Sequence, residues 1–222
     1  MQDRHDRYSY ASRPGRRSPA PRGSRRGHRG RRERPARAVA RCLAAKLPGA
    51  EGELAPRGRR MSGVAAIAEA IRRGETTAEA ETRAAFARLE RVGASCNAVA
   101  ALDLDAALAQ ARAIDKRRAA GEALGPLAGV PMAHKDLFYR AGRACHCGSK
   151  IRAGFVPDTT STALSRLDAA GAVDLGTLHM AEFALSPTGY NEHYGHGRNP
   201  WNTDHICGGS SSGSGIAVAA RA

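Results

Sequence analysis

The feature that most limits what this chain can fold into is a sharp change in composition near residue 60. Residues 1–60 carry 18 of the 35 Lys and Arg residues and 5 of the 21 Asp and Glu residues, a net charge of +13. Rich in Gly, Pro and Ser, this segment cannot bury enough apolar surface to offset the entropy of ordering it. Residues 61–222 have a net charge of +1. We expect a disordered arginine-rich arm over 1–60 and one folded domain over 61–222.

The basic arm has three interpretations. It is a tail that binds nucleic acid through phosphate contacts, a transit-type peptide, or sequence upstream of the true start codon. Met61 stands directly before the first segment with helical periodicity, so a natural chain can begin there instead of at Met1. The position of Met61 favours the third interpretation.

The sequence lacks the patterns of a membrane-spanning protein and of a small secreted protein with disulfides. No run approaches the roughly 20 apolar residues that span a bilayer, so we expect no membrane partner. The cysteines form an odd, unevenly spaced set, unlike the even disulfide framework of a small secreted domain; they are Cys42, Cys96, Cys145, Cys147 and Cys207. We expect a cytoplasmic protein with reduced thiols.

The domain begins with helical patterns. Apolar residues at helical spacing predict one helix up to Gly74 and a second from a capping box to near Gly93, followed by a short strand over 97–103 and a third helix over 105–121. The apolar residues that predict the first helix are Val64, Ile67, Ala68 and Ile71, and the capping box consists of Thr76 and Glu79. After Gly125, short apolar runs broken by Gly and Pro predict a helix near 160–170 and a buried strand over 172–179. This is α/β organisation.

The Gly/Ser loop GGSSSGSG at 208–215 runs straight into the small-residue helix IAVAARA. Locally it fits a flexible linker, a phosphate-binding loop or a catalytic loop. A linker precedes a further domain, whereas here a helix begins at once. The phosphate-binding patterns need a Lys after the loop or a ribose-binding acid downstream, and the sequence has neither.

Three ordered blocks resemble successive motifs of the amidase signature family. They are GPLAGVPMAHKDLF (125–138), GTLHMAEFALSPTGYNEHYGHGRNPWN (176–202) and CGGSSSGSGIAVAA (207–220). The helical strings before them are also similar, so the resemblance covers 61–222. It implies the N-terminal portion of an α/β/α sandwich with a mixed sheet. It also implies hydrolysis of carboxamide C–N bonds through a serine acyl-enzyme, without a metal or organic cofactor.

The resemblance implies a Ser–cis-Ser–Lys catalytic set, of which this chain holds two members. Lys135 corresponds to the lysine of the Lys-Asp motif and Ser210 to the bridging cis-serine. An unperturbed lysine titrates near about 10.4, so it serves as a base only where burial lowers its pKa. The apolar residues 129–133 before Lys135 predict such surroundings. Without the motif, Lys135 reads as an exposed lysine paired with an acid.

The residues around this pair have simpler interpretations. We expect Ser211 and Ser212 to cap the helix that follows them. His134 stands where the family more often has a small apolar residue, and a titratable neighbour would complicate the pKa of Lys135. We interpret His134 as a tolerated substitution. Asn191, Arg198, Asn199 and Trp201 are expected to form loops without chemistry.

The family's nucleophile belongs to a later Gly-Gly-Ser-Ile/Val-Arg segment, which also supplies the oxyanion hole. The 222 residues contain no such segment, so we expect a truncated amidase that is inactive alone. Its substrate would be a small-molecule amide, and it would form a homo-oligomer or join amidotransferase subunits. Two alternatives stay open: the A subunit of a glutamine-dependent aminoacyl-tRNA amidotransferase, and a non-catalytic nucleic-acid-binding protein.

A metal site is the rival interpretation of the cysteines and histidines. Structural zinc sites favour Cys-x₂₋₄-Cys and His-x₃₋₅-His spacings, whereas this chain has Cys-x-Cys and His-x₂-His. The residues concerned are Cys145, His146, Cys147, His179, His193, His196 and Cys207. We therefore expect no metal.

Overall fold

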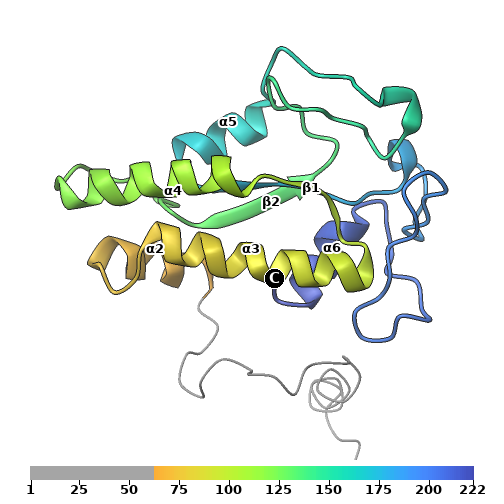
Figure 1. Ribbon diagram of the computed structural model, residues 1–222, viewed down its shortest axis with the longest axis horizontal. Helices are drawn as coiled ribbons and strands as arrows, with labels where there is room; N and C mark the ends of the chain where they lie inside the picture. The colour runs from red at the N-terminus through yellow and green to blue at the C-terminus, as the bar shows by residue number, and fades with distance from the viewer. Residues whose placement is uncertain (1–62) are drawn as a thin grey trace, which may run out of the picture.

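The computed structural model describes residues 63–222 (Figure 1). The expected disordered arm over 1–60, and the choice between Met1 and Met61, lie outside the described residues. The elements are α2 (Val64–Arg73), α3 (Ala78–Cys96), β1 (Val99–Leu102), α4 (Leu104–Ala119), β2 (Pro131–Lys135), η1 (Lys150–Arg152), α5 (Thr162–Ala169), β3 (Val173–Leu178), η2 (Glu182–Ala184) and α6 (Ser212–Ala219). Within this part of the chain no helix is long and apolar enough to cross a membrane.

The three strands form one mixed sheet in the order β1-β3-β2. β1 runs antiparallel to β3, and β2 runs parallel to it. In the view of Figure 1, α2, α3 and α6 lie below the strands and α4 and α5 lie above them. Every residue of β3 is buried, because the strand has a partner on each edge and helices on both sides. The predicted α/β class, mixed sheet and buried strand are confirmed.

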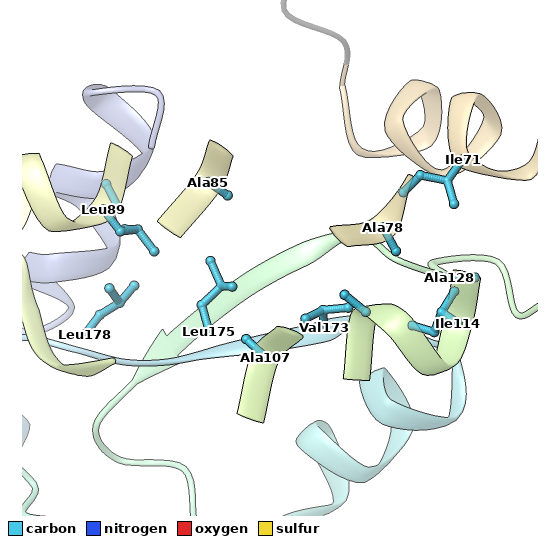
Figure 2. Packing of buried hydrophobic residues seen from close by; sticks show 12 residues of the cluster. Ile71, Ala78, Ala85, Leu89, Ala107, Ile114, Ala128, Val173, Leu175 and Leu178 are labelled. Carbon is cyan, nitrogen blue, oxygen red and sulfur yellow. The ribbon is translucent and has the colours of Figure 1, made fainter. Parts of the chain in front are cut away.

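The main core forms where α2, α3 and α4 meet β3 (Figure 2). Its members are apolar residues with at most 8% exposure, and many are alanines, which lets helices and strand approach closely. They are Ile71, Ala78, Ala85, Leu89, Ala107, Ala111, Ile114, Ala128, Val173, Leu175, Leu178 and Ala217. Because Ala217 of α6 joins this cluster, the C-terminal helix is tied to the same core as the helical hairpin.

The first helix has a narrower buried face than the periodicity predicts. α2 ends as expected at Gly74, whose left-handed φ of 75° lets its amide bond to the carbonyls of Ala70 and Ile71. Ala68 and Ile71 are buried. Val64, expected on the same face, is 55% exposed because it begins the helix, before the chain reaches the core.

The second helix differs from the prediction at both ends. Its N-cap is Thr77, whose side chain accepts a backbone amide at 3.0 Å, so the capping box expected from Thr76 and Glu79 is wrong by one residue. The helix also continues past Gly93 and ends where Asn97 takes a left-handed φ of 53°. Gly93 serves packing instead, because a Cβ there would lie 2.9 Å from a Val99 methyl group.

The last helix docks through a backbone contact that only glycine permits. A Cβ on Gly213 would lie 2.2 Å from the carbonyl oxygen of Ala98 and 2.5 Å from the amide nitrogen of His179. The Gly213 amide donates to the His179 carbonyl at 2.8 Å. The first turn of α6 therefore rests directly on the chain that leaves β3.

Two glycines of α6 provide a matched test of this docking. We expect Gly213→Ala to destabilise the fold by about 1–3 kcal/mol or more, because the methyl group must displace backbone atoms. A Cβ on Gly215 would have no neighbouring atom within 4 Å, so Gly215→Ala should stabilise by about 0.5–1 kcal/mol through helix propensity. Urea unfolding of both variants measures this, and equal effects would contradict the docking.

Candidate active site

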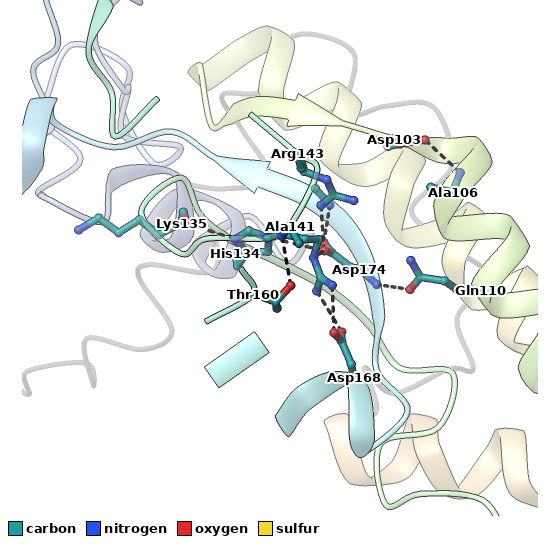
Figure 3. Close-up of polar contacts among 12 residues, drawn as sticks. Asp103, Ala106, Gln110, His134, Lys135, Ala141, Arg143, Thr160, Asp168 and Asp174 are labelled. Atoms are coloured by element: carbon teal, nitrogen blue, oxygen red, sulfur yellow. Dashed lines mark hydrogen bonds and ion pairs between the residues drawn. The ribbon is translucent and has the colours of Figure 1, made fainter. Parts of the chain in front are cut away.

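Lys135 is the last residue of β2 and is buried, with 9% of its surface exposed. Side chains alternate along a strand, so Lys135 faces the opposite side of the sheet from His134 and Asp136. Figure 3 shows the lysine side chain extending away from the cluster around His134 and Asp174. Its amine points toward the loop that precedes α6.

In that loop Lys135 meets Ser210. The Nζ atom donates to Ser210 Oγ at 2.8 Å, across 75 positions of sequence. Ser210 is half-buried, the Gly209–Ser210 peptide bond is cis, and the Ser210 carbonyl accepts the Ala181 amide at 3.1 Å. The fold thus brings together the two residues that the motifs single out.

The surroundings of Lys135 favour its neutral form. Burial lowers the pKa of Lys135 from its ordinary value of 10.5, since water that would solvate an ammonium is largely excluded. Among the described residues no carboxylate forms an ion pair with this amine. The amine therefore loses its proton more readily than an exposed lysine does, which a general base requires.

The histidine next to Lys135 belongs to a separate charge network. His134 Nε2 lies 3.5 Å from Asp174, which is fully buried and also contacts Arg140 at 2.5 Å and Arg143 at 2.8 Å (Figure 3). Burial alone would raise the pKa of Asp174, but His134 and the two arginines hold it below its ordinary value. The cause of the lowered pKa of Lys135 is burial and not His134.

Asp136 fixes the chain directly after Lys135. Its amide donates to the Leu178 carbonyl at 3.1 Å and continues the pairing of β2 with β3. Its buried carboxylate accepts the His146 amide at 3.2–3.3 Å, and its carbonyl accepts the Cys147 amide at 3.0 Å. Burial raises the pKa of the Asp136 carboxyl. With its carboxylate held on the far face, Asp136 positions the strand end.

The two serines after Ser210 do not cap α6 as expected. Ser211 occupies the N-cap position, yet its side chain makes no cap hydrogen bond. The Ser212 hydroxyl points inward, where it lies 2.7 Å from His179 Nδ1. Local sequence favours capping, but Ser212 is 1% exposed and finds its partner inside the protein.

The cysteines and histidines considered for zinc do not form one cluster in the described residues, and they contact different partners. Cys145 Sγ lies 3.9 Å from Cys147 Sγ, and burial, followed by that neighbour, raises the pKa of Cys145 to about 12. Within residues 63–222 no group of three or more His, Cys, Asp or Glu side chains is arranged to hold a metal ion.

A cavity of about 170 Å³ lies beside Asp136, between β1 and the loop around residue 194. Two of its polar side chains, Asn191 and His179, already have protein partners. Asn191 is 2% exposed and donates to the carbonyls of Gly148 and Met180 at 2.8 and 3.0 Å. Asn191 therefore holds the loops that contain Gly148 and Met180 together.

Comparison with known proteins settles the family. The model of the family described as Amidase matches residues 80–222. The chain belongs to the amidase signature family. It is 52% identical over 134 residues to the A subunit of glutamyl-tRNA(Gln) amidotransferase from Aromatoleum aromaticum, covering 60% of this chain and 27% of that protein. The Pseudomonas aeruginosa protein of the same name is 45% identical over 158 residues, covering 71% and 32%.

Solved structures of the amidase signature family share the same fold. The peptide amidase of Stenotrophomonas maltophilia superimposes with a TM-score of 0.66 at 34% sequence identity, covering 71% of this chain and 34% of the other. The chain thus spans about a third of the length of the relatives it matches. What it holds is part of the amidase signature fold.

Burial of Lys135 predicts a pH-dependent stability difference. We expect Lys135→Met to raise the free energy of unfolding at pH 7, by of the order of 1 kcal/mol, because a buried amine is replaced by an apolar chain of similar length. The folded-state pKa is lowered, so wild-type stability rises with pH from that pKa up to the ordinary lysine value. The advantage of Lys135→Met should therefore shrink toward pH 10.

Urea unfolding between pH 6 and pH 10 measures this difference. Lys150→Met is the matched control, because Lys150 is exposed and its replacement should leave the pH dependence unchanged. A constant difference between Lys135→Met and wild type across the range would contradict the assigned burial.

Proposed function

We propose that Lys135 and Ser210 are the proton relay of a serine amidase. The observation that carries this proposal is the 2.8 Å contact between a buried amine and a serine hydroxyl, with no carboxylate paired to the amine in the described residues. Membership of the amidase signature family supports it. The reaction is cleavage of a carboxamide C–N bond.

The chemistry follows from the protonation states. Neutral Lys135 takes the hydroxyl proton of Ser210, while Ser210 takes the proton of an attacking serine, whose oxygen bonds to the amide carbon. When the C–N bond breaks, the proton returns through Ser210 to the leaving nitrogen, which departs as ammonia or an amine. Water or a second amine then attacks the carbonyl carbon of the acyl-serine ester, the C–O bond to the serine breaks, and a proton of the attacking group passes through Ser210 to the serine oxygen.

The attacking serine and the oxyanion donors are supplied by a Gly-Gly-Ser-Ile/Val-Arg segment under this proposal. The triplet Gly208-Gly209-Ser210 is the nearest match in the chain, but Ser211 and Ser212 follow it instead of a β-branched residue and an arginine. Ser210 is also the residue that contacts Lys135. We therefore assign it the bridging role.

A second candidate is one component of an amidotransferase. It is favoured by the 52% and 45% identity to proteins named as the A subunit of glutamyl-tRNA(Gln) amidotransferase. The amide substrate would then be glutamine, and the released ammonia would pass to a partner protein. The nucleic-acid-binding alternative rests on residues 1–60, outside the described residues, and salt-dependent RNA or DNA binding would test it.

Competitive labelling of lysine amines tests the relay in the 222-residue chain. The sequence has four lysines, of which Lys116 and Lys150 are exposed in the structure and serve as internal references. We expect the pH midpoint for acylation of Lys135 to lie below those of the references, because burial favours its neutral form. Ser210→Ala should change the midpoint of Lys135 alone. A Lys135 midpoint equal to the references would refute the relay.

Turnover tests the reaction itself. The 222-residue chain should release no ammonia from glutamine or simple amides, because it holds the relay without the attacking serine. A longer chain supplying that segment should turn over. In it, Lys135→Ala should lower kcat by about 10²–10⁴-fold, and Lys135→Arg should also fail because arginine stays protonated.

The same assay separates the two candidate functions. Preference for glutamine, increased by added amidotransferase subunits, would favour the amidotransferase, while equal turnover of simple amides would favour a stand-alone amidase. Turnover by the short chain that survives Lys135→Ala would overturn the mechanism.

A further inference from the structure

The imidazole of His179 joins three parts of the chain around the Gly/Ser loop. His179 follows β3 directly and is 3% exposed. Its Nδ1 atom lies 2.7 Å from Ser212 Oγ, and its Nε2 atom lies 2.8 Å from the Gly195 carbonyl oxygen. Both ring nitrogens are therefore satisfied by protein groups.

These partners define which ring nitrogen carries the proton. A carbonyl oxygen only accepts, so Nε2 must donate to Gly195. In the neutral ring Nδ1 is then an acceptor. The Ser212 hydroxyl lies 2.7 Å from Nδ1 and 3.3 Å from the His179 carbonyl oxygen, and we assign its proton to the shorter contact. Burial lowers the pKa of His179, more than the Gly195 carbonyl opposes it, which keeps the ring neutral.

The contact with Ser212 supplements two backbone contacts in the same place. The Ala181 amide donates to the Ser210 carbonyl at 3.1 Å, and the Gly213 amide donates to the His179 carbonyl at 2.8 Å. Any residue at position 179 can make that second backbone contact. The bond from Ser212 to the imidazole is the one that depends on this side chain, and it lies two residues from Ser210.

The other ring nitrogen holds the loop that packs on the far end of the Gly/Ser loop. The Gly197 amide donates to the Gly189 carbonyl at 3.1 Å, which closes this loop around Gly195. Gly189 in turn lies against Gly208, since a Cβ on Gly189 would be 2.5 Å from the Gly208 carbonyl oxygen. The imidazole thus contacts the Gly/Ser loop directly at Ser212, and it restrains the other end of that loop indirectly, through the segment around Gly195.

We propose that His179 is a positioning residue for the Lys135–Ser210 pair, acting through the hydrogen bond from Ser212 to its Nδ1 atom. This inference rests on the proposed function. Without that bond the first turn of α6 keeps its two backbone contacts but loses a side-chain restraint. We then expect Ser210 to shift relative to Lys135 and water to reach the lysine amine. The ring holds the geometry and takes no proton from the substrate.

Two amide replacements separate the contacts of the imidazole. In His179→Asn the side-chain oxygen takes the place of Nδ1 and still accepts from Ser212. In His179→Gln the amide nitrogen takes the place of Nε2 and still reaches Gly195. Ser212→Ala removes the donor with a smaller change. His193→Gln is the matched control, because His193 binds Glu182 at 2.8 Å in the same region.

Competitive labelling of Lys135 is the readout, with circular dichroism to follow folding. We expect His179→Gln and Ser212→Ala to raise the Lys135 midpoint by about one pH unit toward Lys116 and Lys150, because water then solvates the ammonium. His179→Asn and His193→Gln should keep the wild-type midpoint. The double variant His179→Gln/Ser212→Ala should show no shift beyond that of Ser212→Ala, since Ser212→Ala already removes the hydroxyl that contacts both the imidazole and the His179 carbonyl.

The outcomes distinguish this inference from the proposed function. A wild-type Lys135 midpoint equal to the references would refute the relay. A low wild-type midpoint that stays unchanged in folded Ser212→Ala would overturn the role of His179 and leave the relay standing. Should His179→Gln fail to fold, an unchanged Lys135 midpoint in Ser212→Ala still overturns the inference, and the response of His179 Nδ1 in that variant reports whether the imidazole was the partner of the hydroxyl.

The proton position gives a measurement that is independent of Lys135. A two-bond ¹H–¹⁵N spectrum of the 222-residue chain reports which nitrogen of each histidine is protonated. We expect Nε2–H for His179, with an unprotonated Nδ1 that changes its shift in Ser212→Ala. A proton on Nδ1 of the neutral ring would overturn the inference.

Discussion

Burial of the Lys135 amine is the constraint on which the rest of the site depends. An ammonium group held away from water needs a carboxylate or loses its proton more easily, and no carboxylate pairs with this one in the described residues. Its contact is the Ser210 hydroxyl at 2.8 Å. The fold meets this constraint by ending β2 at Lys135, beside the fully buried β3 and facing the loop that precedes α6.

The alternation of side chains along β2 keeps the nearby acids away from the lysine. His134 and Asp136 face the opposite side, where Asp136 accepts backbone amides and Asp174 binds two arginines. A carboxylate within roughly 4–6 Å of Lys135 would favour the charged amine, which cannot accept a proton. The acids near β2 thus have partners of their own, and in the described residues neither pairs with the Lys135 amine.

Much of the fold, and the two residues that meet at its candidate site, were accessible from sequence. Helical spacing located α2, α3 and α4, the run at 172–179 located β3, and the motifs singled out Lys135 and Ser210. The predicted helix ends were less accurate. A glycine such as Gly93 can end a helix or allow close packing on a neighbour such as Val99, and only tertiary contacts decide between the two. The roles of His179 and Ser212 were missed, since their bond spans 33 positions and follows no local pattern.

The small residues of the Gly/Ser loop explain why its conformation depends on the imidazole of His179, a residue far away in sequence. With no Cβ, Gly213 lets α6 approach the backbone of His179, but glycines also leave the loop few side chains with which to fix its own conformation. Restraint must then come from neighbours: the Ala181 amide on Ser210, the His179 carbonyl on Gly213 and the imidazole on Ser212. The chain that leaves β3 therefore supplies much of the restraint on the Gly/Ser loop.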